Sequence, residues 1–74
     1  MLPKKSTDLG PLTNRESEIL TIVAKGFSNN EVASALGISS KTVEFHLKNT
    51  YSKLAVSGRS EAISYAISKG YIVP

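Results

Sequence analysis

The fold of this chain is decided by residues 28–47, which have the sequence SNNEVASALGISSKTVEFHL. Two serines that can begin helices, Ser28 and Ser39, lie on either side of Gly37, which suits a tight turn. Ala33 is small enough for two helices joined by such a turn to cross closely. Apolar residues are spaced to hold both helices together: Val32, Leu36, Ile38, Val43 and Leu47. The segment therefore predicts a helix-turn-helix.

One further helix is predicted on each side of this segment. Thr13 followed three residues later by Glu16 is a capping box, which marks the start of a helix. No alternation typical of a strand appears, which argues against a winged helix. The predicted capping residues are Thr13, Ser28, Ser39 and either Ser57 or Ser60. We expect an all-α, four-helix domain with helices at about 14–25, 29–36, 40–54 and 60–69.

Length and composition restrict the class of protein. Seventy-four residues suffice for one small domain, and the absence of cysteine excludes disulfides and thiolate ligands for zinc. No apolar run reaches the roughly 20 residues that cross a bilayer, so we expect a soluble, cytoplasmic protein. The net charge of +3 is a weak indication of an anionic partner. Residues 1–11 predict a flexible arm or interdomain linker, with an expression remnant or a basic tail as alternatives, and residues 12–74 would form the domain.

The helix expected at 40–54 has two different faces when it is projected at 100° per residue. One face predicts core packing and contains Val43, Leu47, Thr50 and Leu54, with Tyr51 at its edge. The opposite face contains Lys41, Phe45, Lys48, Asn49 and Ser52, flanked by Thr42 and Lys53. Cations and small polar groups around one phenylalanine are typical of a helix that binds in the major groove of DNA.

Three residues of the polar face are candidates for contacts with bases. We interpret Phe45 as an apolar contact to a thymine methyl group; a stray surface aromatic, or a contact with another domain, is the alternative. Lys48 would contact guanine or a phosphate. Glu44 can accept a hydrogen bond from a cytosine amine, or pair with Lys48 one turn away.

Other residues near the starts of the second and third helices are candidates for phosphate contacts, because free N–H groups at helix starts bind anions. The candidates for phosphate contacts are Asn30, Ser40, Lys41, Thr42, Asn49 and Lys53. Glu16 faces the core in the predicted first helix, which suggests an ion pair with Lys53 or Arg59. His46 is the only histidine and has no second ligand at metal spacing. We expect no cofactor, no metal site and no enzymatic activity.

The chain also resembles the LuxR-type (GerE-like) helix-turn-helix domain of bacterial regulators, over about residues 11–73. The residues that carry the resemblance are Leu12, Thr13, Arg15, Glu16, Glu18, Ile19 and Leu20, then Ser28, Asn29, 31–33, 36–39 and 41–47, then Lys53, Leu54 and 59–62. The resemblance implies that the third helix enters the major groove and that the fourth mediates dimerisation on an inverted repeat. It also implies phosphate contacts for Lys41 and Thr42. Two residues depart from the family's pattern: Ser52 replaces a frequent arginine, and Ala55 replaces a frequent glycine.

The helix expected at 60–69 supports a dimer independently of the resemblance. Its apolar residues Ile63, Tyr65 and Ile67 spread beyond one narrow face, which suggests a second partner. The alternative is that residues 71–73 fold back and cover this surface. We therefore expect double-stranded DNA and a second copy of the chain as partners, with an upstream receiver or ligand-sensing domain and RNA polymerase as further candidates. Two other functions fit the pattern: a monomeric module like region 4 of sigma factors, and a protein-interaction module that does not bind DNA.

Overall fold

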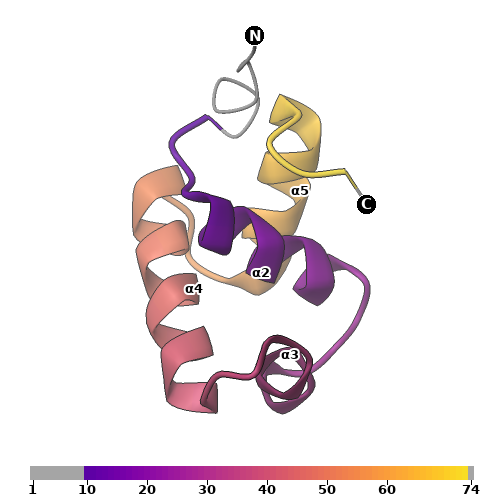
Figure 1. The fold of residues 1–74 in the computed structure, drawn as a ribbon. Coiled ribbons are helices and arrows are strands. Elements are labelled where there is room, and N and C mark those ends of the chain that lie inside the picture. Colours follow the sequence, from indigo (N-terminus) through magenta and orange to yellow (C-terminus); the bar gives the residue numbers. More distant parts are fainter. Residues whose placement is uncertain (1–9, 74) are drawn as a thin grey trace, which may run out of the picture.

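The computed structural model describes residues 10–73, which form four helices and no strand (Figure 1). The helices are α2 (Asn14–Ala24), α3 (Asn29–Leu36), α4 (Ser40–Leu54) and α5 (Arg59–Lys69). The all-α, four-helix class predicted from the sequence is confirmed. Most of the arm predicted at residues 1–11 lies outside the described residues. None of the helices in residues 10–73 is long and apolar enough to cross a membrane.

Three helices begin at the capping residues that the sequence predicts. The hydroxyl of Thr13 accepts the backbone N–H of Glu16 at 3.1 Å, and the Glu16 carboxylate accepts the N–H of Thr13 at 3.0 Å. A second capping box, between Ser28 and Glu31, begins α3, and Ser39 caps α4. These bonds satisfy backbone donors that have no partner within their own helices, so the local sequence fixes where these helices begin.

The predicted capping residue of α5 was wrong, although the helix begins within one residue of the predicted start. Its N-cap is Gly58, which has no side chain to cap with, rather than Ser57 or Ser60. Glu61 instead reaches back to Ser57, where its carboxylate accepts the backbone N–H at 3.0 Å and the hydroxyl at 2.7 Å. These hydrogen bonds lower the pKa of Glu61. Half of a capping box is thus present at α5, one residue out of the usual register, and the other half is missing because Gly58 has no side chain.

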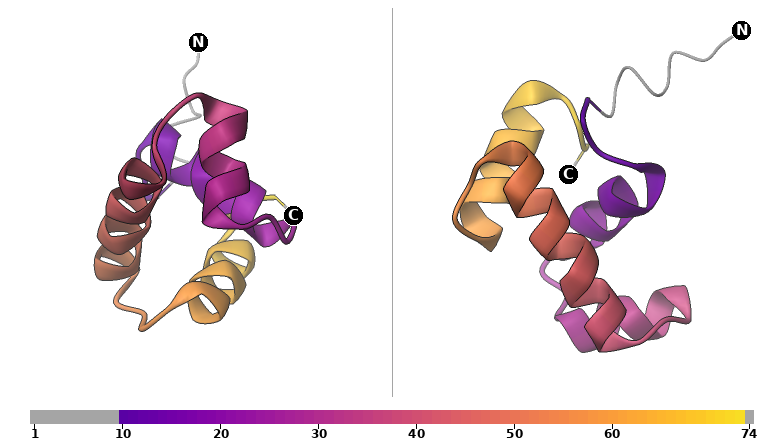
Figure 2. Two further views of the ribbon diagram at one scale, coloured as in Figure 1. Left: turned by 90° about the horizontal axis from the view of Figure 1, so that it is seen from below. Right: turned by 90° about the vertical axis from the view of Figure 1, so that its left-hand side faces the viewer.

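The core lies between α4 and the other three helices, all of which pack against it (Figure 2). The core residues are Leu12, Ile19, Leu20, Val23, Val32, Ala33, Val43, Leu47, Leu54, Ala62, Ala66 and Ile72. Thr50 is also fully buried, and its hydroxyl donates to the backbone carbonyl of His46 at 2.8 Å, which satisfies the one polar atom of that side chain. The predicted apolar face of α4 is therefore its core face.

Left-handed residues end α3 and α4. Gly37 ends α3 with φ 68°, as the helix-turn-helix requires. Ala55 ends α4 with φ 56° and ψ 44°, and it is the only residue other than glycine with positive φ within residues 10–73. An L-residue in this conformation places its Cβ too close to the following carbonyl oxygen, at a cost of about 1–2 kcal/mol. Ala55 thus holds the left-handed conformation at the end of α4 at the cost of backbone strain.

The two ends of the described chain pack together beside α5 (Figure 1). Ile72 is buried, so residues after α5 do fold back onto the core. The ring of Tyr71 lies against the backbone of Gly10, where an added Cβ would be 2.3 Å from the ring. The rings of Tyr71 and Tyr65 meet edge to face with their centroids 6.2 Å apart. These contacts join the start of the domain to α5.

Candidate nucleic-acid interface

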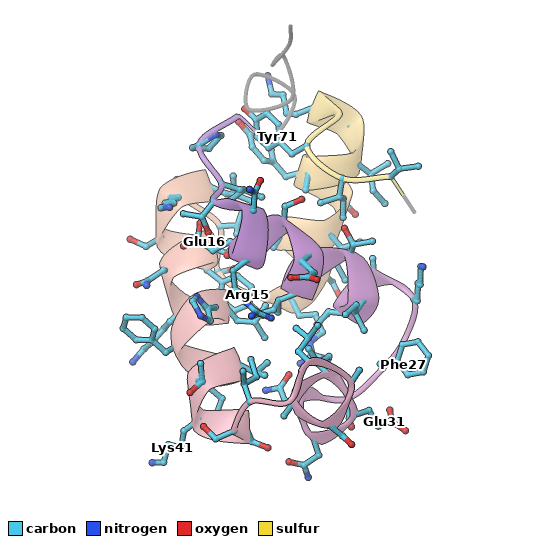
Figure 3. All side chains as sticks on the ribbon, in the orientation of Figure 1. Arg15, Glu16, Phe27, Glu31, Lys41 and Tyr71 are labelled. Carbon is cyan, nitrogen blue, oxygen red and sulfur yellow. The ribbon has the colours of Figure 1, made fainter. Side chains whose placement is uncertain are left out.

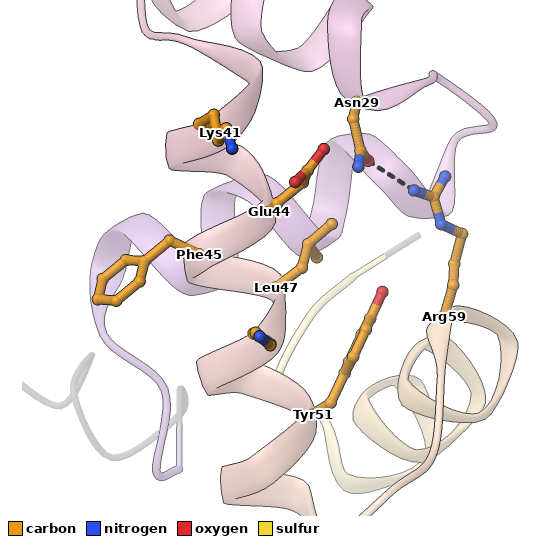
Figure 4. A pocket seen from close by; sticks show the side chains of 8 residues that line it. Asn29, Lys41, Glu44, Phe45, Leu47, Tyr51 and Arg59 are labelled. Carbon is orange, nitrogen blue, oxygen red and sulfur yellow. Dashed lines mark hydrogen bonds between the residues drawn. The ribbon is translucent and has the colours of Figure 1, made fainter.

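Helix α4 presents one face to the core and the opposite face to solvent. Val43 and Leu47 expose 0% and 3% of their surface, whereas Phe45, between them in sequence, exposes 60%. The ring of Phe45 projects outward from α4 (Figure 4). Lys41, Glu44 and Lys48 are exposed on the same side. A large aromatic surrounded by charged side chains and excluded from its own core is suited to contact another molecule.

The outer face of α4 forms one wall of a groove of about 500 Å³. The residues that line it are Asn29, Lys41, Glu44, Phe45, Leu47, Lys48, Tyr51 and Arg59 (Figure 4). The groove brings together all three residues predicted to contact bases with Lys41, and with Asn29 from the start of α3. It adds Tyr51 and Arg59, which the sequence did not place there. The side chains that line the groove include three cations and one carboxylate, so the groove is electrostatically suited to bind an anion.

Arg59 and Asn29 join the starts of two helices at the edge of this groove. A terminal nitrogen of the Arg59 guanidinium, Nη2, donates to the Oδ1 of Asn29 at 2.6 Å. Arg59 is the first residue of α5 and Asn29 the first residue of α3. This contact was not predicted, because it depends on where α2 and α4 place the starts of α3 and α5, and no local pattern encodes that packing.

Glu16 pairs with Lys53, the first of the two partners that we considered. The Lys53 ammonium donates to the Glu16 carboxylate at 2.7 Å, and only 3% of Glu16 is exposed. Burial alone would raise the pKa of Glu16, but hydrogen bonds from Lys53 and Thr13 and the charge of Lys53 outweigh it, so the pKa lies below its ordinary value of 4.5. Lys53, a predicted phosphate contact, is therefore already engaged within the protein.

Four of the five remaining candidates for phosphate contacts gather around the turn of the helix-turn-helix, whereas Asn49 is half-buried further along α4. The Ser40 hydroxyl donates to the Asn30 amide oxygen across that turn, which links the start of α4 to the start of α3. The hydroxyls of Ser39 and Thr42 lie 2.9 Å apart. The structure thus brings Asn30, Ser40 and Thr42 to one polar surface near the start of α4, beside the exposed Lys41 (Figure 3).

Glu44 does not pair with Lys48. Among residues 10–73, the ion pairs join Lys53 to Glu16 and Arg15 to Glu18. The exposed carboxylate of Glu44 therefore keeps its capacity to accept hydrogen bonds from a ligand. The ring of His46 meets that of Phe45 edge to face, with centroids 5.7 Å apart.

The predicted dimer surface on α5 is partly exposed. Tyr65 and Ile67 expose 36% and 38% of their surface, whereas Ile63 is half-buried against the core. Lys69 places its ammonium 5.7 Å from the centroid of the Tyr65 ring. The fold-back of residues 71–73 that we considered as an alternative occurs in part, because Ile72 is buried and Tyr71 meets Tyr65, but it does not cover α5 completely.

Comparisons with known proteins identify the family to which the chain belongs. Residues 10–66 match the family model of bacterial regulatory proteins of the luxR family, GerE type. The chain is 51% identical over 61 residues to the response regulator protein VraR of Staphylococcus aureus (strain Mu3) and to that of Staphylococcus saprophyticus, and the matched part covers 82% of this chain and 29% of each relative. The chain thus spans about three tenths of the length of these curated relatives.

Two solved structures resemble the fold. The structure of the transcription factor GerE has a TM-score of 0.80 and 42% sequence identity, and the match covers 84% of this chain and 92% of GerE. The response regulator ChrA of a heme-sensing two-component system has a TM-score of 0.81 and 39% identity, and the match covers 96% of this chain and 33% of ChrA. The resemblance noted from the sequence is confirmed, and the matched family is one of DNA-binding regulators rather than a class of enzymes. The chain belongs to the luxR family of bacterial regulatory proteins and is a DNA-binding helix-turn-helix domain of transcription regulators.

Proposed function

We propose that this domain binds a specific double-stranded DNA sequence with α4 in the major groove, as a homodimer on an inverted repeat. The observation that carries the proposal is Phe45, which is 60% exposed on the outer face of α4 while Val43 and Leu47 on the inner face are buried. An apolar side chain at the centre of a cationic helix face is suited to contact a thymine methyl group in the major groove.

The neighbours of Phe45 have the chemistry to recognise further bases. Lys48, one turn away, would donate to the O6 and N7 acceptors of guanine. Glu44, which has no ion-pair partner within residues 10–73, would accept from the amine of cytosine. Phe45, Glu44 and Lys48 line one groove, so a single DNA segment can meet all three.

Phosphate contacts would set the position of α4 in the groove and supply most of the affinity. Those that we propose come from Asn30, Ser40, Lys41, Thr42 and Asn49. The Lys53 ammonium donates one of its protons to Glu16, so only its remaining protons are free to contact a phosphate.

The proposed dimer uses α5, where Tyr65 and Ile67 are exposed and Ile63 borders them. Two copies related by a two-fold axis would present two α4 helices to half-sites about 34–36 Å apart, one turn of the DNA helix. Because relatives such as VraR are response regulators and this chain covers 29% of their length, we further propose that the domain acts downstream of a receiver domain.

Selection of bound sequences from a pool of random duplexes tests the proposal. We expect the protein to enrich an inverted repeat, and Phe45→Ala to relax the preference at one or two thymine positions. Phe27→Ala is the matched control, because Phe27 is 45% exposed but lies outside the groove beside α4 (Figure 3). The absence of any enrichment at low salt would contradict DNA recognition, and enrichment of a single half-site would contradict only the dimer.

A further inference from the structure

We infer that Arg59, together with Asn29 and Tyr51, forms a binding site for one phosphate of the DNA backbone at the flank of α4. This inference rests on the proposed function and adds a contact from α5, the helix that we assign to dimerisation. It starts from a groove that is continuous from the base-contacting face of α4 to the starts of α3 and α5.

The dimensions of DNA place a sugar-phosphate strand along this groove. An α-helix with its side chains is about 10–12 Å wide and the major groove is about 12 Å wide. A helix that fills the major groove therefore has a backbone strand along each flank. Glu44, Lys48 and Tyr51 are spaced by four and three residues, so they follow one flank of α4, and this flank forms a wall of the groove. Arg59 and Asn29 line the same groove.

The chemistry of the three side chains suits a phosphodiester oxygen. A guanidinium has five N–H donors, and the bond to Asn29 occupies one of those on Nη2. The Asn29 amide accepts that bond through its oxygen, which leaves its NH₂ group as a donor. The hydroxyl of Tyr51 is a third donor, and the three side chains are directed into the space beside α4 (Figure 4).

The bond between Arg59 and Asn29 also holds the guanidinium in place before DNA arrives. Both residues are half-buried. An arginine that is already ordered loses less conformational entropy when it binds a phosphate than a mobile surface lysine does. The alternative is that Arg59 only ties α5 to α3, in which case its charge would have no role in DNA binding.

Salt dependence distinguishes these roles. We expect Arg59→Gln to weaken binding to the selected duplex and to an unrelated duplex by a similar factor, about 10-fold or more, and to reduce the slope of log K against log salt by about one. Asn29→Ala breaks the same bond but keeps the guanidinium, so its slope should stay close to that of the unaltered protein. Lys25→Gln removes an exposed cation outside the groove and should leave both quantities unchanged.

Neutral phosphates locate the contact. The probe is the selected duplex with one uncharged methylphosphonate, moved along each strand in turn. At one position we expect the unaltered protein to lose affinity and Arg59→Gln to lose none. Tyr51→Phe, which removes only a hydroxyl, should lose about threefold in affinity for the selected duplex. The same methylphosphonate should reduce the affinity of Tyr51→Phe less than that of the unaltered protein. If Arg59→Gln fails to fold, this variant tests the phosphate site instead.

The outcomes separate this inference from the proposed function. An unchanged salt slope in Arg59→Gln, or the absence of any methylphosphonate position at which the variants differ from the unaltered protein, would overturn the phosphate site while leaving DNA recognition intact. A failure of the unaltered protein to bind any duplex would instead overturn the proposed function.

Discussion

The inner and outer faces of α4 have opposite compositions although they share fifteen residues. The inner face, which contains Val43, Leu47, Thr50 and Leu54, is buried against the other three helices. The outer face exposes Phe45 beside Lys41 and Lys48. A substitution on one face should therefore change the stability of the domain, and a substitution on the other should change what the domain binds. Periodicity within one helix keeps the two properties apart.

The largest expected effect tests the inner face. Leu47→Ala should lower the free energy of unfolding by about 2–5 kcal/mol, because it removes buried methyl groups and leaves a cavity. Phe45→Ala, two positions earlier on the outer face, should change it by less than about 0.5 kcal/mol. Urea denaturation followed by circular dichroism measures both. Similar losses in the two variants would show that Phe45 packs within the domain.

The second prediction tests the outer face. Lys48→Ala should weaken binding to the selected duplex by about 1–3 kcal/mol if Lys48 reads guanine, with little change in stability. Fluorescence anisotropy on the selected duplex and on duplexes altered at single positions provides the measurement. A loss of equal size on every sequence would reassign Lys48 to a phosphate.

The third prediction concerns the ion pair that attaches the flank of α4 to α2. Glu16→Gln should lower the free energy of unfolding by roughly 1–2 kcal/mol at neutral pH, a modest value because about a third of the Lys53 side chain is exposed. The pKa of Glu16 is lowered in the folded state, so its contribution is complete above the ordinary value of 4.5 and is lost as the pH falls through the lower folded value.

Thermal unfolding between pH 7 and pH 2 checks this sign. Stability should decline on acidification below about pH 4.5 in the unaltered protein, and less steeply in Glu16→Gln. Glu18→Gln is the matched control, since Glu18 is on the same helix but its side chain is 52% exposed in its pair with Arg15. An equal decline in both variants would mean that Glu16 does not contribute to the pH dependence.

The smallest effect lies at the end of α4. Ala55→Gly should raise the free energy of unfolding by about 1 kcal/mol, because glycine adopts the left-handed conformation at φ 56° without strain. Ala35→Gly, the same change within α3, should lower it by about 0.5–1 kcal/mol. Opposite signs for one chemical change would confirm that backbone conformation, rather than side-chain contacts, sets the effect.

Local patterns predicted most of the fold, and packing determined the rest. Thr13, Ser28 and Ser39 marked three helix starts because their bonds stay within one turn. The cap of α5 was missed because it is Gly58, which has no capping side chain, and not a serine. The two faces of α4 followed from helical periodicity. Arg59 could not be placed in the groove from the sequence, because its position depends on how α5 packs against α2 and α4.

The close approach of Gly10 to Tyr71 has a mechanical consequence. The chain passes against the Tyr71 ring as it joins the domain, and that ring in turn meets Tyr65 on α5. Because an added Cβ at position 10 would lie 2.3 Å from the Tyr71 ring, any larger residue there would displace this ring, which also contacts Tyr65. Gly10 is therefore coupled, through two tyrosine rings, to the surface of α5 that we assign to pairing two copies, although it lies far from α5 in the sequence.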